Sequence, residues 1–245
     1  MSLEQILLGV NTLQELEHIL RTASNFADPG ERIRFLSDHL LGTNYAESTL
    51  MGGHKNPEIF VINLERVDCM TFIEYIEAMR LSSSFREFVA NLKKVRYKSG
   101  VVDFHSRNHF FTDWREFNAD FIEDVTESVG GARTVGILKK LNEREDGTSF
   151  LQGIQPVIRK ISYVPSESIG PEVTKNLLTG DYIGIFSHLQ GLDVSHTGIT
   201  VRQNDFAYFR HASSHPEKRR VIDQDLRDYI AHKPGIVVFR PKKQA

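Results

Sequence analysis

The sequence predicts an α+β protein in which helices come first and an antiparallel sheet follows. Apolar residues at helical spacing mark the first half of the chain, whereas β-branched, alternating segments mark the last third. The chain's only cysteine, Cys69, directly precedes a helical pattern, and His196 and His211 fall on consecutive predicted strands. We therefore expect one domain over residues 1–245, in which a helix that starts with a thiol packs on a sheet that carries imidazoles.

The expected elements follow in order. N-terminal helices occupy about 1–55, and the core spans about 60–240, with a helical insertion at about 99–150. Helices are expected at 12–21, 29–41, from Cys69 onward, at 85–93, 113–123 and 134–141. Strands are expected at 59–64, 157–163, 181–187, 193–201, 206–213 and 235–240. Asp28-Pro29 opens the second helix, because proline suits a first helical turn.

Composition excludes several classes of protein. Hydrophobic residues make up 40% of the chain, which is ordinary for a globular protein. A formal net charge of −2 gives no basic surplus for a nucleic-acid partner. One cysteine cannot form an intrachain disulfide, and no apolar run reaches the ~18 residues expected of a transmembrane segment.

The position of Cys69 predicts a nucleophile. A thiol in the first turn of a helix lies at the positive end of the helix dipole, which favours the thiolate and lowers the pKa of the thiol. Asp68 can cap this helix, and Thr71 with Glu74 adds a second N-terminal signal. The competing interpretation is a buried, inert cysteine that acts as a small hydrophobic residue.

The two histidine strands strengthen the nucleophile interpretation. With a period of two, His196 shares a face with Val194 and Gly198, and His211 shares one with Phe209. If both faces lie on one side of an antiparallel pair, the imidazoles become neighbours. We then expect a relay in which Cys69 attacks, His196 takes and returns the proton, and His211 orients His196.

Three segments carry a resemblance to a known family: Asp68-Cys69-x-x-Phe72, His196-x-Gly198-Ile199 and His211-Ala212-Ser213. They resemble the signature segments of the NlpC-type, papain-like cysteine peptidases of bacterial cell walls. Within that superfamily, the block from Ser106 to Trp114 is similar to the N-acetylmuramoyl-L-alanine amidase-like family, formerly a domain of unknown function. The resemblance runs from about residue 63 to 240.

The resemblance implies a papain-like fold and cleavage of an amide bond in peptidoglycan fragments, with Cys69, His196 and His211 in the catalytic positions. It favours small muropeptides, 1,6-anhydro forms among them, over the intact sacculus, and it implies no cofactor. The superfamily's usual Asp-Cys-Ser-Gly is Asp68-Cys69-Met70-Thr71 here. In an amidase substrate the alanine nitrogen is acylated, so we expect Asp68 to serve as a helix cap. D,L-endopeptidase cleavage remains an alternative, as does a noncatalytic module that binds wall fragments.

The block around residues 105–114 has competing interpretations. His105, His109 and Asp113 are spaced i, i+4, i+8, so a continuous helix would align them as ligands of a zinc hydrolase. A polar loop with solvated histidines is the plainer interpretation. The resemblance favours a third, in which Arg107, His109 and Trp114 line the substrate cleft. Arg107 would pair with a stem-peptide carboxylate, and Trp114 would stack on a sugar unless it belongs to the core.

The first residues, Met1 to Gln5, lack the basic patch and apolar run of a secretory signal. Two interpretations are open, a cytoplasmic protein or a mature form whose leader has been removed. The resemblance favours a periplasmic or secreted protein, because peptidoglycan and its shed fragments lie mostly outside the cytoplasm.

Overall fold

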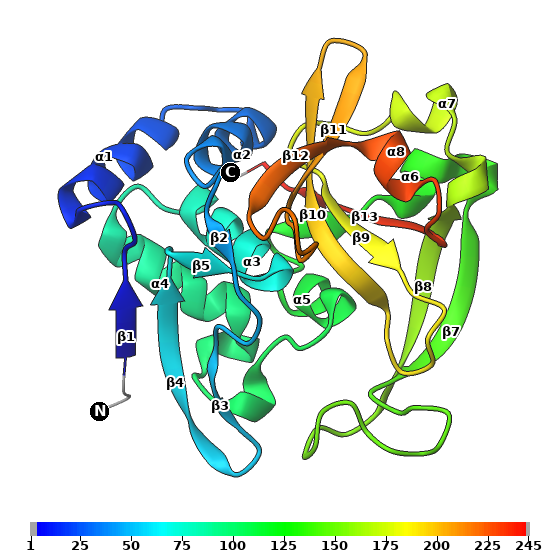
Figure 1. The fold of residues 1–245 in the computed structure, drawn as a ribbon, viewed down its shortest axis with the longest axis horizontal. Coiled ribbons are helices and arrows are strands. Elements are labelled where there is room, and N and C mark those ends of the chain that lie inside the picture. Colours follow the sequence, from blue (N-terminus) through cyan, green and yellow to red (C-terminus); the bar gives the residue numbers. More distant parts are fainter. Residues whose placement is uncertain (1–3, 244–245) are drawn as a thin grey trace.

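The computed structural model describes residues 4–243 (Figure 1). The helices are α1 (Leu13–Ala23), α2 (Pro29–Asp38), α3 (Cys69–Arg80), α4 (Phe85–Arg96), α5 (Phe111–Phe117), α6 (Thr126–Gly130), α7 (Pro171–Thr174) and α8 (Leu226–Ile230). Short 3₁₀ turns are η1 (Lys98–Gly100), η2 (Phe104–Ser106), η3 (Gly131–Arg133) and η4 (Ser166–Ser168). No helix of the described residues is both long and apolar enough to cross a membrane.

The strands are β1 (Glu4–Leu7), β2 (Asn44–Tyr45), β3 (Met51–Gly53), β4 (Asn56–Asn63), β5 (Arg66–Val67), β6 (Ile122–Asp124), β7 (Val135–Leu141), β8 (Val157–Pro165), β9 (Tyr182–Phe186), β10 (Val194–Gln203), β11 (Phe206–Ala212), β12 (Val221–Asp225) and β13 (Gly235–Pro241). The main sheet has the order β12-β11-β10-β9-β13-β8-β7, with β6 added beside β13, and its strand pairs are antiparallel. Smaller sheets have the orders β1-β4-β3 and β2-β5. The predicted α+β class is confirmed.

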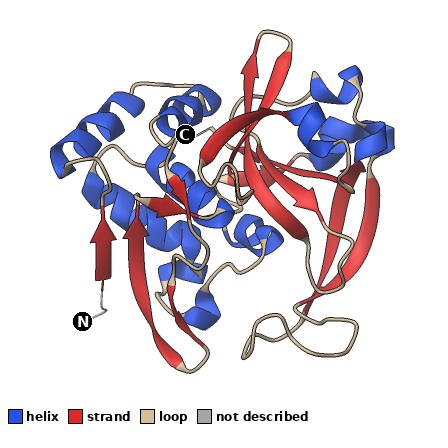
Figure 2. Ribbon diagram, in the orientation of Figure 1, coloured by secondary structure: helices blue, strands red, loops and turns tan. Residues whose placement is uncertain are grey.

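The main sheet is covered on both faces. Helices α1 to α4 gather on one side, with α3 against the strands, while α6, α7 and α8 lie on the other (Figures 1 and 2). Alternation along β9 shows the two cores: Tyr182 and Phe186 pack with the N-terminal helices, whereas Ile183 and Ile185 pack with α6 to α8. A strand that is buried on both faces accounts for the unbroken apolar run in this segment.

The predicted helix starts are confirmed by their caps. The Thr12 hydroxyl accepts from the Glu15 amide, and the Glu15 carboxylate accepts from the Thr12 amide in return, which is a capping box. Asp28 accepts from the Glu31 amide at 3.0 Å, with Pro29 in the first helical turn. α2 ends at Asp38, earlier than predicted, and the chain continues in turns toward Gly42.

Of the two predicted helices of the insertion, one is a strand and the other is shorter than predicted. Residues 134–141 form strand β7, which pairs with β8 from Val135 opposite Tyr163 to Leu141 opposite Val157. Their apolar spacing fits a helix, but the partner strand decides the outcome. Of residues 113–123, only the start is helical. The Asn118 side chain donates to the Trp114 carbonyl at 2.7 Å and ends α5 there, and the chain then enters β6 beside β13.

Helix α3 is buried almost all round, because helices cover one side and the sheet the other. Its charged residues are matched by cations. Arg96 of α4 donates to Glu74 at 2.6 Å, and Arg80 donates to Glu77 at 2.6 Å. Removing one partner of such a buried pair costs about 3–5 kcal/mol, so these contacts fix α3 in place.

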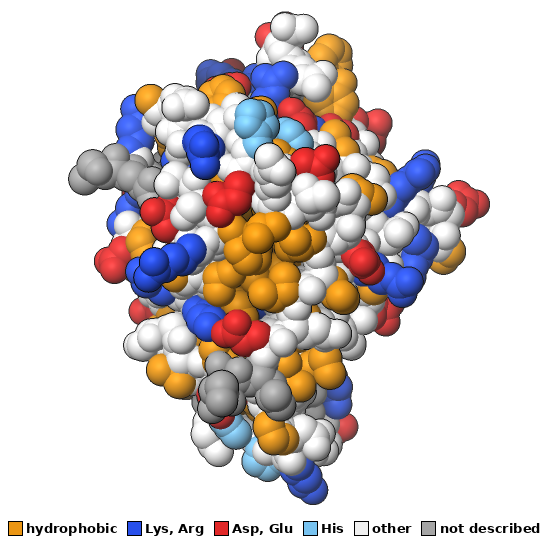
Figure 3. Space-filling model, turned by 90° about the vertical axis from the view of Figure 1, so that its left-hand side faces the viewer, with side chains coloured by type: hydrophobic (Ala, Val, Ile, Leu, Met, Phe, Trp, Pro, Cys, Tyr) orange, Lys and Arg blue, Asp and Glu red, His pale blue; other side chains and the backbone are white. Residues whose placement is uncertain are grey.

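Hydrophobic side chains also reach the surface at the N-terminal end. Figure 3 shows a group of them in the middle of the face that carries β1 and α1. The exposed large hydrophobic residues of these two elements and the turn between them are Ile6, Val10 and Leu13. This surface belongs to the helical side of the molecule, away from the strands that carry the histidines.

Candidate active site

Cys69 is the first residue of α3, and its position is set by a local cap. Asp68 accepts from the Thr71 amide at 2.8 Å, and the Thr71 hydroxyl accepts from the Asp68 amide at 2.9 Å. Asp68 therefore serves as the helix cap, as predicted. The cap directs the first amides of α3 toward one end of the helix, where Cys69 lies as a partly buried residue.

His196 on β10 and His211 on β11 lie on one face of the main sheet. The register puts Ile199 opposite Arg210, which makes the two histidines diagonal neighbours. Their rings stand nearly perpendicular, at 88°, and Nε2 of His196 lies 2.7 Å from Nδ1 of His211. The predicted pairing of the imidazoles is confirmed.

Gly198 makes room for this pair. It lies between the histidines on the same face, and a Cβ there would come within 2.5 Å of the Phe209 ring. The Phe209 ring in turn stacks on His211, with centroids 4.7 Å apart and planes at 17°. A glycine in the middle of β10 thus lets an aromatic ring support the second imidazole.

A residue that sequence reasoning missed completes the chain of hydrogen bonds. Oε1 of Gln224, on β12, lies 2.8 Å from Nε2 of His211. An amide oxygen only accepts, so Nε2 of His211 carries a proton and its Nδ1 is a lone pair. That lone pair accepts from Nε2–H of His196. Nδ1 of His196 is therefore unprotonated and free to act as a base.

The backbone of Cys69 is hydrogen-bonded to Thr197, the residue that follows His196 on β10. The Thr197 hydroxyl donates to the Cys69 carbonyl at 2.8 Å, which joins the start of α3 to β10. Tyr229 of α8 packs against both imidazoles. The centroid of its ring lies 6.2 Å from that of His196 and 4.8 Å from that of His211. Burial raises the pKa of Tyr229 to about 12, and the charge of an ionised Cys69 adds to this effect. The start of α3 is thus joined to the strand that carries His196, at the residue next to that imidazole.

Cys69 and His196 are both neutral at pH 7. Burial, with the adjacent Asp68 charge, raises the pKa of the Cys69 thiol to about 11, although hydrogen bonds from Thr197 act against this. Burial lowers the pKa of His196 to about 3, and the His211 and Lys233 charges add to the effect. The expected lowering of the thiol pKa is wrong, because loss of water and the capping carboxylate outweigh the helix dipole.

The rate at which iodoacetamide alkylates Cys69 should rise about tenfold per pH unit between pH 6 and 9, because the thiolate fraction grows tenfold per unit below the pKa of the thiol. Intact-mass spectrometry reports this rate without ambiguity, since the chain has one cysteine. A rate that is already flat from pH 6 to 8 would mean a preformed thiolate–imidazolium pair.

Arg107 and His109 lie in the loop around η2 and are held there by their own chain. Nε and Nη2 of Arg107 donate to the two carboxylate oxygens of Glu58, each at 2.6 Å. Its guanidinium is thus neutralised and not free to grip a stem-peptide carboxylate, contrary to the prediction. Nε2 of His109 lies 2.7 Å from the Phe104 carbonyl, and burial lowers the pKa of His109 to about 4. The neutral ring therefore ties this loop to itself.

Trp114 belongs to the core, which corrects its predicted place in the cleft. The side chain is fully buried. Its ring meets the Tyr182 ring edge-on and stacks with the Phe111 ring, with centroids 5.0 Å and 5.9 Å apart. Its indole N–H has no hydrogen-bond acceptor among the described residues. Packing of the ring between α5 and the sheet leaves it no surface for a sugar.

Trp114→Ala should lower the free energy of unfolding by about 3–5 kcal/mol, the cost of removing a large buried aromatic ring. Trp114→Phe should cost much less, because it keeps a ring in the space and removes an N–H that lacks an acceptor. Urea titration measures both. Equal losses for the two variants would mean that ring packing does not account for the role of Trp114.

The predicted metal alternative is not assembled. His105 lies on η2, Asp113 on α5 pairs with Arg159 at 2.7 Å, and His109 faces the Phe104 carbonyl. Within residues 4–243, no three side chains of the metal-ligating types come together. The loop between η2 and α5 breaks the continuous helix that the i, i+4, i+8 spacing required.

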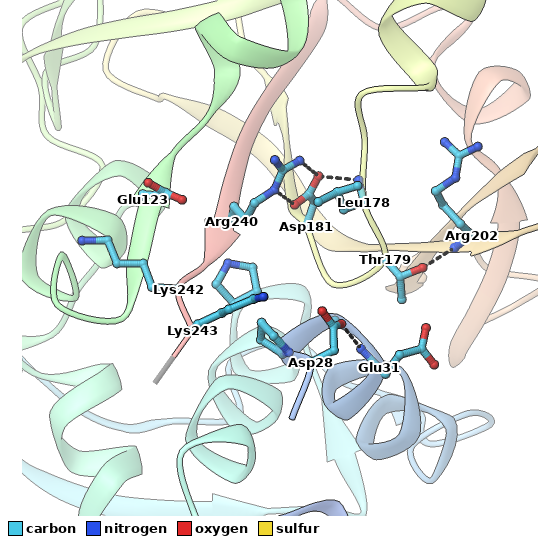
Figure 4. A pocket seen from close by; sticks show the side chains of 13 residues that line it. Asp28, Glu31, Glu123, Leu178, Thr179, Asp181, Arg202, Arg240, Lys242 and Lys243 are labelled. Atoms are coloured by element: carbon cyan, nitrogen blue, oxygen red, sulfur yellow. Dashed lines mark hydrogen bonds and ion pairs between the residues drawn. The ribbon is translucent and has the colours of Figure 1, made fainter. Parts of the chain in front are cut away.

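A larger cavity, of about 620 Å³, lies between the start of α2 and the end of β13 (Figure 4). Several of its charged side chains are held by partners within the chain. Arg240 donates to both Asp181 oxygens at 2.7 Å, and Asp28 caps α2. No cysteine or histidine lines it, so the cavity beside the imidazoles, of about 330 Å³, is the better candidate for chemistry.

A thiol at the start of a buried helix and imidazoles on the sheet beside it define a papain-like protein with a candidate cysteine-hydrolase site. Residues 35–236 match the model of the N-acetylmuramoyl-L-alanine amidase-like family, and the chain belongs to this family. At the level of the family it is a peptidoglycan amidase.

Solved structures agree on the fold. A protein of Legionella pneumophila from the DUF1460 family has a TM-score of 0.79 and 22% sequence identity, over 94% of each chain. An N-acetylmuramoyl-L-alanine amidase of Bacteroides uniformis has a TM-score of 0.68 and 26% identity, over 84% of this chain and 97% of that one. No curated protein shows significant sequence similarity to the chain.

Proposed function

We propose that this chain is a cysteine amidase that hydrolyses the amide between the lactyl group of N-acetylmuramic acid and L-alanine in a muropeptide. The observation that supports this most is the directed chain of hydrogen bonds from Gln224 through His211 to His196. It leaves Nδ1 of His196 unprotonated, on the strand that Thr197 joins to the start of the Cys69 helix. The family match supports the amide bond of peptidoglycan as the target.

In the proposed reaction, Sγ of Cys69 attacks the lactyl carbonyl while Nδ1 of His196 takes the thiol proton. The backbone N–H of Cys69, at the open end of α3, donates to the oxyanion. Collapse breaks the C–N bond, and the proton on His196 passes to the alanine nitrogen as the peptide leaves. Water then attacks the thioester with His196 as base, which restores the thiol and releases the lactyl carboxylate.

Small muropeptides, including 1,6-anhydro forms, are the proposed substrates rather than the intact sacculus. The cavity beside the imidazoles holds about 330 Å³, which suits one segment of a peptide better than a cross-linked strand. Because such fragments lie mostly outside the cytoplasm, a periplasmic or secreted location is part of the proposal.

Mass spectrometry of the products from a defined disaccharide-tripeptide tests the proposal. Free disaccharide and free tripeptide are expected, because only amidase cleavage releases both. A disaccharide-dipeptide with a free third residue would instead assign the chain to the D,L-endopeptidases of the superfamily. Binding without turnover in the wild type would point to a noncatalytic module.

A further inference from the structure

The cavity beside the imidazoles has an unusual charge composition. Lys218, in the loop between β11 and β12, and Lys233, after α8, line it together with His196 and His211. No aspartate or glutamate is among its lining residues. The larger cavity differs, because carboxylates such as Asp181 stand beside its cations. A hollow lined by cations without counter-charges attracts anions.

The two ammonium groups are not neutralised from within the described part of the chain. Neither Lys218 nor Lys233 makes an ion pair there, whereas the buried Arg80, Arg96 and Arg210 each have a carboxylate partner. The backbone N–H groups of both lysines donate within tight turns, to His215 and Ile230, each at 2.9 Å. The chain thus fixes the positions from which these side chains reach the cavity.

Lys233 lies close to the reacting groups. Its Nζ is 5.6 Å from the centroid of the Tyr229 ring, which packs against both imidazoles. Its charge also contributes to the low pKa of His196. An anion bound at Lys233 would offset that charge and make His196 a stronger base.

In the proposed reaction, the leaving peptide is the part of the substrate that enters the cavity beside the imidazoles. His196 must protonate the leaving nitrogen, so that nitrogen lies within hydrogen-bond reach of the imidazole. The peptide beyond it then extends from His196 into the cavity that His196 lines. In a stem peptide the residue after L-alanine is a γ-linked glutamate, whose free α-carboxylate lies on the order of 6 Å from the scissile nitrogen.

Building on the proposed amidase function, we propose that Lys218 and Lys233 form an anion subsite for the α-carboxylate of the second stem-peptide residue. Arg107 was predicted to bind a stem-peptide carboxylate, but it is paired with Glu58. The two lysines would take over that role. It would make the enzyme select acidic stem peptides over those whose α-carboxylate is amidated. Substrate charge would also activate the base, because the bound carboxylate compensates Lys233.

The test compares N-acetylmuramoyl-L-alanyl-γ-D-glutamate with its α-amide, which differ in this one charge. The wild type should show at least about tenfold higher kcat/KM for the acid, the scale of a charge-assisted contact. Lys218→Met and Lys233→Met should each reduce this ratio toward one, and Lys233→Arg should restore part of it. Lys175→Met, which removes a lysine outside the cavity, should keep the wild-type ratio.

Binding separates this inference from the proposed function. Calorimetry on the Cys69→Ala protein should give at least about tenfold tighter binding of the acid than of the amide, with the difference lost in the Lys218→Met background. A wild type that binds the acid preferentially but cleaves neither ligand would remove the amidase proposal and keep the subsite. Equal affinities for acid and amide, or an unchanged ratio in both lysine variants, would overturn the subsite.

Discussion

Cys69→Ala should abolish hydrolysis of the disaccharide-tripeptide, with a loss in kcat/KM of at least about ten-thousandfold, because no other thiol exists in the chain to form the thioester. The fold should survive. Cys69 is partly exposed in the first turn of α3, where alanine fits the helix, so the free energy of unfolding should stay within about 1 kcal/mol of the wild type. Steady-state kinetics and urea titration measure the two effects.

Two controls sharpen this result. Cys69→Ser should leave little activity, because a hydroxyl is far harder to ionise than a thiol. Iodoacetamide should inactivate the wild type, whereas a chelator should have no effect, the reverse of what a zinc hydrolase would show. If Cys69→Ala turns over substrate within tenfold of the wild type, the thiol mechanism is wrong.

Features encoded by near neighbours could be predicted from the sequence. Asp68 and Thr71 cap α3 within one turn, so the start of the helix and the place of Cys69 follow from local chemistry. The period of two along β10 and β11 likewise gives the face of its own strand on which each histidine lies, but the register that puts both on one side of the sheet had to come from the structure.

The rest depended on partners distant in sequence. The sequence of β7 favours a helix, but its pairing with β8 makes it a strand. Arg107 was predicted to be a free cation, but Glu58 of β4 forms an ion pair with it. Gln224 was missed because β12, with the sequence Val-Ile-Asp-Gln-Asp, carries a weak apolar signal and was not predicted as a strand. The role of Gln224 depends on His211 of the neighbouring strand β11, and a local sequence pattern does not show which strands are neighbours.

The second large effect concerns the hydrogen-bond chain. His196→Ala should lower kcat by several orders of magnitude, because it removes the base that takes the thiol proton and the acid that returns it to the leaving nitrogen. His211→Asn should cost less, since an amide oxygen can still accept from Nε2–H of His196. If His211→Asn proves as damaging at equal stability, the roles of the two histidines are reversed or the third member is misassigned.

Gln224 extends this ordering with a readout that a purely structural role would not change. Gln224→Leu should lower kcat by about ten- to a hundredfold, because nothing then holds the proton on Nε2 of His211 and either tautomer can form. Gln224→Glu keeps the accepting oxygen and should retain most of the turnover. Its negative charge favours protonated imidazole, so the acid limb of the kcat/KM profile should move to higher pH.

The direction of that shift is the decisive observation. In the wild type, burial holds the pKa of His211 at about 4 and that of His196 at about 3, so the base stays unprotonated well below neutrality. A carboxylate in place of the Gln224 amide raises these pKa values, and activity is then lost earlier as the pH falls. An acid limb that stays in place in Gln224→Glu, together with full turnover in Gln224→Leu, would mean that His211 orients His196 without help from β12.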